Sequence, residues 1–589
     1  MSAPLPALSR ARILLLVLGI AAATYANALG NGWAVDDEYI VRDNPVVTEG
    51  RWGDAVSGAY WTGLEAEPSL WRPTTLAVLT AQWQAFGGRP LAFHAVSLLL
   101  HALVSVLVVL LLAAVLPTAA AAAGGALFAA HPVHVEAVAN VVGQSELLAA
   151  AFYLGACVLY LRTRDAGARA RALRLPALAL LYALAIGAKE SGITLPGVLL
   201  LLGLVVPERR GEVPAPRRVR QRLVADLPVY VTLGAVAGAY LCLRVWVLGS
   251  VTGEDVPAEL RALGTGARVL TALSLWPTYL RLLVIPFDLS SDYGPAVLLP
   301  ATGVRTDVVA GALILAALGA TALAARRHPW AALAAGWLVI TVLPISHLLF
   351  PAGTMLGERT LYLPSVAVAL AAGGGLALVA TRRPQRVRLA AAAGALVVGV
   401  FLVRSVVRNP TWFDSFSVMS ALAREHHESW RAHRSRAAGL VRAGDVTGAL
   451  GEYDEALRLR PGDYAMLCEA GSLYKRQRQL APAERLLTAA VRVEPDRPLA
   501  YRLLAELYLL AGDGRRAHAT ALAGLARWGS DHDLWALVSE SYVAKGDLPA
   551  AVRARQAALA FDPSSASDRG RLAELLAAQS SAPADASAR

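Results

Sequence analysis

Long apolar runs separated by short polar turns fill the chain as far as residue 408. A helix needs about 20 apolar residues to cross roughly 30 Å of hydrocarbon, and most of these runs have about that length. The pattern therefore predicts about 11 transmembrane helices. We place them near residues 13–29, 93–116, 118–131, 145–161, 174–188, 190–206, 225–248, 303–325, 329–350, 361–380 and 389–407.

Two apolar segments are ambiguous. The first run follows Arg10 and Arg12, as a signal peptide would, but it has no compelling small-residue cleavage site, so we interpret it as a retained anchor. The segment Leu270–Pro286 contains Pro277 and Arg281, and a full crossing there would put the later arginine clusters outside the cytoplasm. We therefore expect a re-entrant or interfacial helix on the outer side, where non-helical backbone is tolerated if it lines a cavity.

The charges of the turns indicate the orientation, because cytoplasmic turns of membrane proteins are rich in arginine and lysine. The segment Arg162–Arg174 holds five arginines and one acid, and Arg209–Arg222 holds six arginines and one glutamate. The turns at Arg326–Arg327 and Arg382–Arg388 are also basic. The first loop, Asn31–Trp71, instead holds eight acids and two arginines. We therefore expect a cytoplasmic N-terminus and an external first loop.

Beyond residue 408 the pattern changes to that of soluble helices and repeats itself. Pro461 and Pro495 lie 34 residues apart, and Pro563 lies two such periods further on. A 34-residue period with small residues where helices touch resembles the tetratricopeptide repeat (TPR). The recurring small residues and tyrosines are Ala456, Ala490 and Ala558, then Ala483, Ala517 and Ala551, then Tyr474, Tyr508 and Tyr542.

The expected fold class is therefore all-α, a polytopic membrane protein followed by an α-solenoid of TPRs. The expected boundaries are a transmembrane part at 1–408, a linker at 409–429, about four repeats at 430–565 and a flexible C-terminal tail at 566–589. An odd number of crossings from a cytoplasmic N-terminus puts the repeats on the same outer side as the first loop.

Composition supports this class and excludes others. Of the 589 residues, 56% are hydrophobic and 17% are charged, whereas soluble domains carry roughly 25% charged residues. Three scattered cysteines cannot form a disulfide framework or a Cys-based metal site. The net charge of +11 lies in short clusters between apolar runs, which favours membrane topology over nucleic-acid binding. The high content of Ala, Arg, Gly and Leu indicates a GC-rich bacterial genome, and hence the inner (cytoplasmic) membrane.

Polar residues gather at the outer ends of the predicted spans. Ionisable residues at membrane depth are costly and usually functional. A phosphate needs a cationic clamp, and an acceptor hydroxyl needs a carboxylate as general base. The clamp candidates are Arg72, Lys189 and Arg359, and the base candidates are the first-loop acids Asp36, Asp37 and Glu38.

Six segments resemble a known family in sequence and order. They read DDEYIVRDNP, WRPTTLAVLT, LAFHAVSLLLH, HPVHVEAVANVVGQSELL, GAKESGITLPG and GERTLYLPS. Followed by TPRs, they resemble the transmembrane and tetratricopeptide-repeat-containing O-mannosyltransferases, within the GT-C class of polyprenyl-phosphate-sugar glycosyltransferases. The resemblance covers nearly the whole chain. It implies transfer of a sugar, mannose in the family, from a lipid phosphate carrier to serine or threonine of exported proteins, with the repeats engaging acceptor or partner protein.

The resemblance also implies roles for single residues. The family's acidic first-loop motif carries over onto Asp36 and Asp37, with Glu38 as the neighbouring candidate. One departure puts a donor contact in doubt, because Gln144 stands where the family has arginine. The residues expected to bind the donor phosphate or sugar are Arg72, His131, His134, Glu136, Lys189, Glu190, Asp292, Glu358, Arg359 and Tyr362.

Other interpretations stay open at this stage. The first-loop acids could form a solvated turn, and Arg72 and Lys189 could reach only to the interface. His131, His134 and Glu136 have metal-ligand character, but no further strong ligand is evident, so no cofactor is implied and a divalent metal stays an alternative. A rival function is a non-enzymatic membrane adaptor for envelope or secretion complexes. A transporter is disfavoured because the membrane part shows no inverted repeat.

Overall fold

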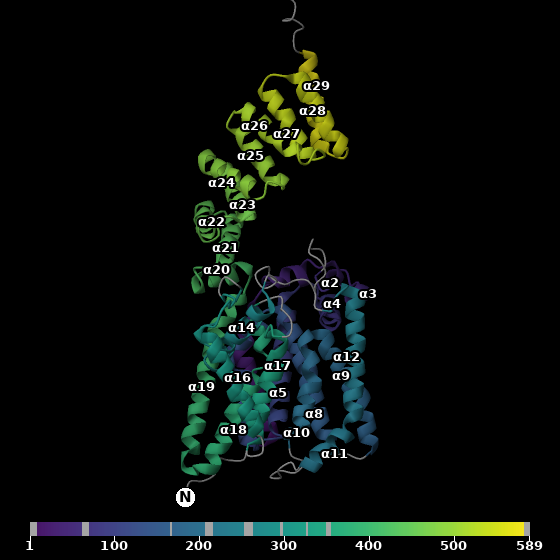
Figure 1. Cartoon of the computed structure of the whole chain (residues 1–589), viewed down its shortest axis with the longest axis vertical. Coiled ribbons are helices and arrows are strands. Elements are labelled where there is room, and N and C mark those ends of the chain that lie inside the picture. Colours follow the sequence, from purple (N-terminus) through teal and green to yellow (C-terminus); the bar gives the residue numbers. More distant parts are fainter. Residues whose placement is uncertain are drawn as a thin grey trace, which may run out of the picture. The chain divides into compact units, whose positions relative to one another are not determined.

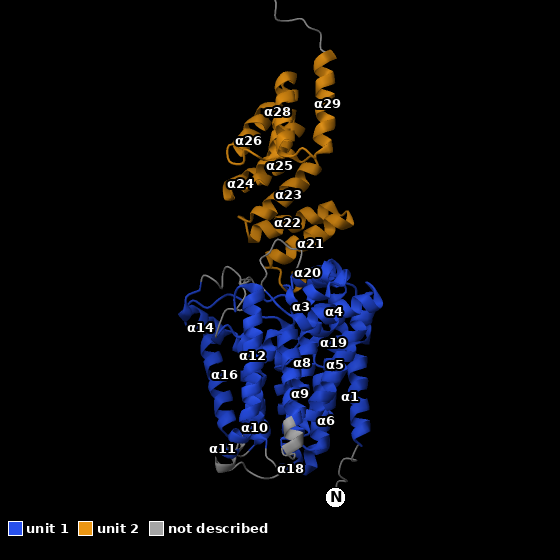
Figure 2. Cartoon of the chain, turned by 90° about the vertical axis from the view of Figure 1, so that its right-hand side faces the viewer, with its two compact units in different colours: residues 1–422 blue, residues 423–589 orange. Residues whose placement is uncertain are grey.

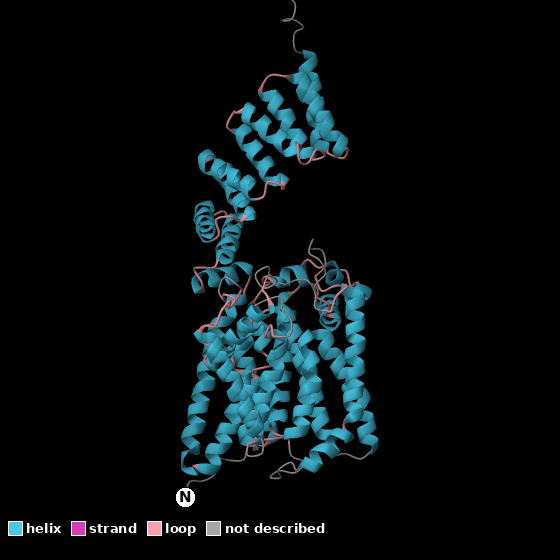
Figure 3. Ribbon diagram, in the orientation of Figure 1, coloured by secondary structure: helices cyan, strands magenta, loops and turns pink. Residues whose placement is uncertain are grey.

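The computed structural model describes residues 9–61, 70–164, 168–206, 216–251, 263–294, 298–324, 328–348 and 355–581. Within these ranges the chain is helical and contains no strand, which confirms the all-α fold class (Figure 3). The chain divides into two compact units, residues 1–422 and residues 423–589 (Figure 2). Several of the predicted basic turns lie at least partly outside the described residues, at Arg209, Arg210, Arg326 and Arg327.

Each predicted apolar run of the first unit contains a helix, and these helices run side by side as a bundle (Figure 1). Six of them, counted with short flanking turns, are long and apolar enough to cross a membrane, and the other five are shorter. The protein is therefore a multi-pass membrane protein. The helices are α1 (Arg10–Tyr25), α5 (Pro90–Leu112), α6 (Thr118–Ala129), α8 (Gln144–Thr163), α9 (Ala168–Ala188), α10 (Leu195–Val205), α12 (Leu227–Leu248), α16 (Thr306–Leu323), α17 (Pro329–Val342), α18 (Val366–Arg382) and α19 (Val387–Arg408).

Close approach of backbones lets the short helix α6 lie at the centre of the bundle. This helix is rich in alanine and glycine, and eight of its twelve residues are buried. A Cβ atom on Gly124 would lie 2.4 Å from the carbonyl oxygen of Ala369 in α18. Small residues at such contacts replace the hydrophobic effect as the driving force for helix association in lipid.

Short helices shape the polar end of the first unit. The first loop contains α2 (Pro45–Thr48) and α3 (Trp52–Ser57), and it leads into α4 (Pro73–Phe86). Proline at the first position of α2 and α4 suits a helix start, where no intrahelical N–H bond is lost. These three helices lie at the end of the bundle opposite to α11 (Pro216–Ala225), as both views show (Figures 1 and 2).

The predicted re-entrant segment 270–286 is broken into two short helices, α14 (Thr265–Ser274) and α15 (Trp276–Val284). Neither is among the apolar helices that could span a membrane. Pro277 starts α15 because it cannot continue the hydrogen-bond ladder of α14. Tyr279 and Leu282 are fully buried in the core of the first unit, so this segment packs against the bundle.

Four helix pairs build the second unit, at the predicted period. Five of the eight helices begin with an aspartate whose side chain accepts a hydrogen bond from the third helical amide, as Asp463 does from Met466 N at 3.0 Å. The pairs are α21 (Trp430–Ala443) with α22 (Val446–Leu459), α23 (Tyr464–Arg476) with α24 (Leu480–Val493), α25 (Pro498–Leu510) with α26 (Gly514–Leu525), and α27 (His532–Ala544) with α28 (Leu548–Phe561).

The structure differs from the expected linker and tail. Residues 409–422 of the expected linker belong to the first unit, because Trp412 and Val418 are buried in its core. Part of the expected flexible tail is the helix α29 (Ala566–Ser581). It is held because Leu575 is buried and Asp568 accepts from Arg555 Nη1 at 2.5 Å; residues 582–589 lie outside the described residues.

Candidate functional site

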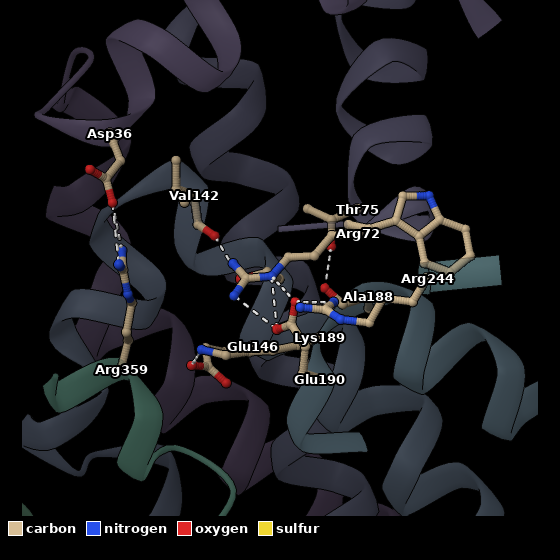
Figure 4. Close-up of polar contacts among 12 residues, drawn as sticks. Asp36, Arg72, Thr75, Val142, Glu146, Ala188, Lys189, Glu190, Arg244 and Arg359 are labelled. Atoms are coloured by element: carbon tan, nitrogen blue, oxygen red, sulfur yellow. Dashed lines mark hydrogen bonds and ion pairs between the residues drawn. The ribbon is translucent and has the colours of Figure 1, made fainter. Parts of the chain in front are cut away.

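Eight charged side chains from distant parts of the sequence meet in the first unit. We call them the charged cluster: Asp36, Arg72, Glu136, Glu146, Lys189, Glu190, Arg244 and Arg359. Several lie at helix ends and turns: Asp36 is two residues before a π-helical turn at 38–42, Glu146 is in the first turn of α8, and Lys189 directly follows α9. Figure 4 shows most of them as three neighbouring groups of ion pairs.

The first group is built around the guanidinium of Arg359, which lies in the short 3-10 turn Glu358–Leu361 before α18. Both terminal nitrogens of Arg359 lie 3.2 Å from Asp36 Oδ2, and its Nε lies 3.4 Å from Glu136 Oε1. The backbone N–H of Arg359 also donates to Glu136, at 2.8 Å. The side chains of Asp36 and Arg359 are 25% and 24% exposed, so this ion pair can be reached from outside the protein.

The second group is the ion pair between Lys189 and Glu146, which is nearly fully buried. Burial lowers the pKa of Lys189, the carboxylate of Glu146 raises it, and the neighbouring guanidiniums of Arg72 and Arg359 lower it further. Lys189 therefore lies within electrostatic reach of both outer groups, and the cluster acts as one unit.

The third group places two guanidiniums on one carboxylate. Arg72 donates to both oxygens of Glu190, at 2.9 to 3.3 Å, and Arg244 Nη1 lies 3.4 Å from Glu190 Oε1 (Figure 4). Thr75 of α4 donates to the carbonyl of Ala188 at 2.8 Å and so fixes the turn that carries Glu190. An arginine fork that binds a carboxylate in this way can also bind a phosphate.

Asp37 has a different environment from Asp36, although the two are neighbours in sequence. Its side chain is fully buried and accepts three backbone N–H groups, from Ala34 and Val141 at 3.2 Å and from Val142 at 2.7 Å. Burial raises the pKa of Asp37 to about 7, against the opposing effect of these three donors. The carboxyl of Asp37 thus joins the first loop to the start of α8, and no part of it faces solvent.

Glu38, the third acid of the loop, is bound on both sides. Its Oε1 accepts from Ser415 Oγ at 2.5 Å, and its Oε2 accepts from Arg42 at 3.3 Å. The side chain is 19% exposed. Glu38 therefore joins the first loop to the segment after α19. Of the three acids, only Asp36 belongs to the charged cluster.

Glu358 is buried beside the charged cluster and makes contacts of its own. Its Oε1 accepts from the backbone N–H of Ser290 at 2.5 Å and from the hydroxyl of Tyr293 at 2.8 Å. Burial raises the pKa of Glu358 to about 8. Asp292 lies in the same loop and is half-buried. Its backbone carbonyl accepts a hydrogen bond from Ser290 Oγ.

The histidines of the predicted donor site are used for packing and capping. His131 accepts from Val133 N at 3.2 Å through Nδ1, and its Nε2 lies 2.9 Å from the carbonyl of Leu283. His134 Nε2 lies 2.7 Å from Ser365 Oγ, and the hydroxyl of Tyr362 bonds to His101. No group of three metal-ligating side chains occurs in the part of the chain that the structure describes.

Gln144 stands in an amide pair. Gln144 and Gln82 exchange two hydrogen bonds, at 2.7 and 3.2 Å, and Gln144 also donates to the carbonyl of Phe93 at 3.0 Å. The side chain is fully buried. The position where the family has arginine is thus satisfied by neutral groups, and none of these contacts involves the charged cluster.

The structure brings together six residues of the predicted site, namely Asp36, Arg72, Glu136, Lys189, Glu190 and Arg359. It places Asp37, Glu38, His131, His134, Asp292, Glu358 and Tyr362 outside that network of ion pairs. Sequence reasoning missed Arg244, although one signal could have found it: a lone arginine inside the apolar run of α12.

These features define a class, a multi-pass all-α membrane protein with a cluster of ion pairs at one end of its bundle and a unit of TPR-type helix pairs. Within that class the chain is similar to the protein O-mannosyl-transferases, which confirms the resemblance expected from the sequence. It is 24% identical to protein O-mannosyl-transferase TMTC3 of Mus musculus, over 80% of this chain and 53% of that protein. It is 26% identical to TMTC1 of Homo sapiens, over 78% of this chain and 56% of that protein.

A shorter match reaches higher identity: Tmtc2 of Drosophila melanogaster is 35% identical over 48% of this chain and 30% of that protein. The chain spans about half the length of the curated relatives that it matches over most of its own length. No family model matches the chain. Among solved structures, MamA 41-end of Desulfovibrio magneticus RS-1 has 18% identity and a TM-score of 0.24, over 26% of this chain and 85% of that one.

Proposed function

We propose that the protein is a membrane glycosyltransferase that moves a sugar from a polyprenyl-phosphate carrier to hydroxyl groups of exported proteins. The observation that carries this proposal is the charged cluster, in which a half-exposed carboxylate lies beside several arginines and a lysine. Similarity to protein O-mannosyl-transferases supports it and points to mannose as the sugar. The transmembrane part, 1–408, would hold the active site, as in the GT-C class.

In this mechanism Asp36 is the general base. The acceptor hydroxyl attacks the anomeric carbon of the donor, and its proton passes to Asp36. The bond between the anomeric carbon and the phosphate oxygen breaks, and the electron pair leaves with the lipid phosphate. Arg72 and Lys189 would hold that phosphate and stabilise the charge it gains, and Arg359, which is paired with Asp36, would orient the base. Glu136 orients Arg359, which it contacts through both side chain and backbone.

The TPR unit would engage the acceptor or a partner protein. The helices α21, α22, α23 and α25 contribute to a cavity of about 380 Å³, which is lined by Tyr464, Arg476, Leu499 and Leu503 among others. Leu499 is largely exposed. Concave faces of repeat arrays commonly bind extended peptides, so this cavity is the proposed contact for the polypeptide substrate.

The proposed location is the inner membrane of a bacterium, with the first loop and the repeats on the outer side and the N-terminus in the cytoplasm. The excess of arginine in the opposite turns supports this orientation. It is tested by a reporter fused after residue 410, which should behave as external. A cytoplasmic signal from that fusion would reverse the orientation.

The catalytic assignment is tested by Asp36→Asn, which keeps the shape of the side chain and removes its basicity. The matched control is Asp43→Asn, on the same loop, whose carboxylate is 53% exposed and paired only with Arg42. With equal expression, transfer from polyprenyl-phosphate mannose to a peptide should fall by 10²-fold or more in the first variant, the usual contribution of a general base. Asp43→Asn should retain activity. Full activity of Asp36→Asn would overturn the assignment of Asp36 as the base, whereas absence of transfer by the wild type would favour the non-enzymatic adaptor.

A further inference from the structure

The charged cluster is electrically polarised. The group around Arg359 has two carboxylates and one guanidinium, a net charge of −1. The pair of Lys189 with Glu146 is neutral. The group around Glu190 has two guanidiniums and one carboxylate, a net charge of +1. The cluster as a whole is neutral, but one side has an excess of acid and the other an excess of arginine.

Arg244 supplies that excess positive charge from a buried position, where a charged group has a high desolvation cost. Its side chain is 4% exposed and lies near the C-terminal end of the apolar helix α12. Its Nε donates to the carbonyl of Val251 at 2.8 Å, and its Nη1 lies 3.4 Å from the hydroxyl of Tyr240. Tyr240 in turn donates to the carbonyl of Trp71, the residue before Arg72, and stacks on its ring. Hydrogen bonds and ring stacking therefore fix the position of Arg244 and of its neighbours.

A second buried arginine of the same helix bundle shows what a balanced pair looks like. Arg174 and Asp226 lie 2.7 Å apart and are almost fully buried, and Tyr160 donates to the same carboxylate at 2.6 Å. Asp226 stands at the N-cap position of α12, whereas Arg244 lies near the other end of this helix, about 27 Å further along at 1.5 Å per residue. This pair joins one cation to one anion, so it carries no excess charge, unlike the group around Glu190.

We propose that Arg244, together with Arg72, forms the seat for the donor's phosphate, and that Glu190 occupies this seat in the ligand-free protein. The inference rests on the proposed function. It adds a residue that binds the phosphate and the side from which the phosphate enters. The ligand class is a phosphate monoester or diester on a lipid. Glu190 is the most exposed member of the group, at 28%, so the seat opens on the side where the carboxylate now lies.

The polarity of the cluster suits the charge changes of the transfer. A lipid phosphodiester with one negative charge becomes a monoester with up to two, and a seat with an excess positive charge stabilises that gain. The proton released by the acceptor appears on the acid side, at Asp36. The proton and the leaving phosphate are thus received at opposite ends of one cluster. Arg359, in the acid half, also orients Asp36.

The experiment measures binding of undecaprenyl phosphate to the full-length protein in nanodiscs, with undecaprenol as the probe that lacks phosphate. The variants are Arg244→Gln, Arg244→Lys and Glu190→Gln. Arg174→Lys is the matched structural control, because it alters a buried guanidinium that has a balanced partner. The unfolding midpoint is recorded for every protein, with and without the lipid phosphate.

We expect the wild type to bind undecaprenyl phosphate and not undecaprenol. Arg244→Gln should weaken binding about 10-fold or more, as loss of a charge-assisted contact does, and Arg244→Lys should recover part of it. Glu190→Gln should unfold at a lower temperature than the wild type without lipid, yet gain more stability when the lipid phosphate is added, because its internal competitor is gone. Arg174→Lys should lower the midpoint and leave binding unchanged.

The outcomes separate this inference from the function on which it rests. Wild-type binding with equal affinity in Arg244→Gln, together with unchanged or weaker binding in Glu190→Gln, overturns the assignment of the seat and leaves the glycosyltransferase proposal standing. Absence of wild-type binding to undecaprenyl phosphate overturns both. Loss of binding in Arg174→Lys equal to that in Arg244→Gln shows that destabilisation alone accounts for the effect, and also refutes the seat.

Discussion

Replacing Glu358 by glutamine should make the protein more stable in mild base. Glu358 is fully buried, and its Oε1 accepts hydrogen bonds from Ser290 N–H and from the Tyr293 hydroxyl. Glutamine keeps that oxygen and matches the shape of the protonated acid. Because burial raises the pKa of Glu358 to about 8, the folded protein holds a proton there that the unfolded chain releases at its ordinary pKa of 4.5.

The sign follows from proton linkage. Between about pH 4.5 and pH 8 the folded state binds more protons than the unfolded state, so the free energy of unfolding falls as the pH rises. The two pKa values, about 8 and 4.5, differ by about 3.5, and each pKa unit corresponds to about 1.4 kcal/mol, which gives a loss of about 5 kcal/mol over this interval. The value is an upper bound, because the unfolded chain of a membrane protein stays partly compact. Glutamine does not titrate and should show no such loss.

The measurement compares unfolding midpoints of wild type and Glu358→Gln at several values between pH 5 and pH 8 in one detergent. The difference between the two proteins isolates this carboxyl from the other titrating groups. Glu49→Gln is the control, because Glu49 is 57% exposed and pairs only with Arg51 on the surface. The reasoning predicts that Glu358→Gln gains on the wild type as the pH rises. A constant difference, or a variant that becomes relatively less stable at pH 8, refutes it.

Three further changes have expected outcomes that follow from single contacts. Asp37→Ala removes a buried acceptor from the N–H groups of Ala34, Val141 and Val142, of which Val142 also donates to Asn140 Oδ1 at 3.1 Å; at about 1 kcal/mol or more for each hydrogen bond lost, its unfolding midpoint at pH 5 should fall well below that of Asp36→Asn, and equal midpoints would contradict the structural role of Asp37. Gln144→Arg puts a cation among two amide and carbonyl partners, which should cost several kcal/mol and lower the midpoint and the yield; a stable variant would show that an anion lies within its reach. Asp568→Asn removes one of two carboxylates from the buried Arg555 and should destabilise α28 and α29 by about 2 kcal/mol, seen as faster proteolysis at the C-terminal end of the full chain; an unchanged cleavage pattern would show that α29 is held by apolar contacts alone.

Local pattern was sufficient to predict the elements of both units. Apolar runs of span length depend only on neighbouring residues, so each predicted run coincides with a helix, and the 34-residue period predicted the helix pairs. The tail 566–589 was predicted wrongly over residues 566–581, because the burial of Leu575 depends on α28 rather than on its own composition. The linker was misjudged over 409–422 for the same kind of reason: Trp412 packs on the core of the first unit.

The partners of the charged residues could not be predicted in this way. Asp36 and Arg359 are separated by 323 residues, and Arg72 and Glu190 by 118, so their pairing is set by how the helices pack. Asp36 and Asp37 have the same side chain in the same motif. The structure shows that the side chain of Asp36 is partly exposed and that of Asp37 fully buried. Sequence alone left all three first-loop acids as candidates for the base.

The balance of charge in the cluster argues for chemistry over architecture. Eight ionised groups at the end of a membrane bundle carry a large desolvation cost, and a single neutral pair such as Arg174 with Asp226 would join helices at much smaller cost. A scaffold does not need separated charges. The cluster nevertheless has an excess acid on the side of Asp36 and an excess arginine on the side of Arg244, with Lys189 between them. Group transfer from a phosphate needs that separation, because a proton and a leaving phosphate must be received at different places in the same step. The polarised arrangement is therefore easier to explain by transfer of a phosphate-linked group than by an anchoring role.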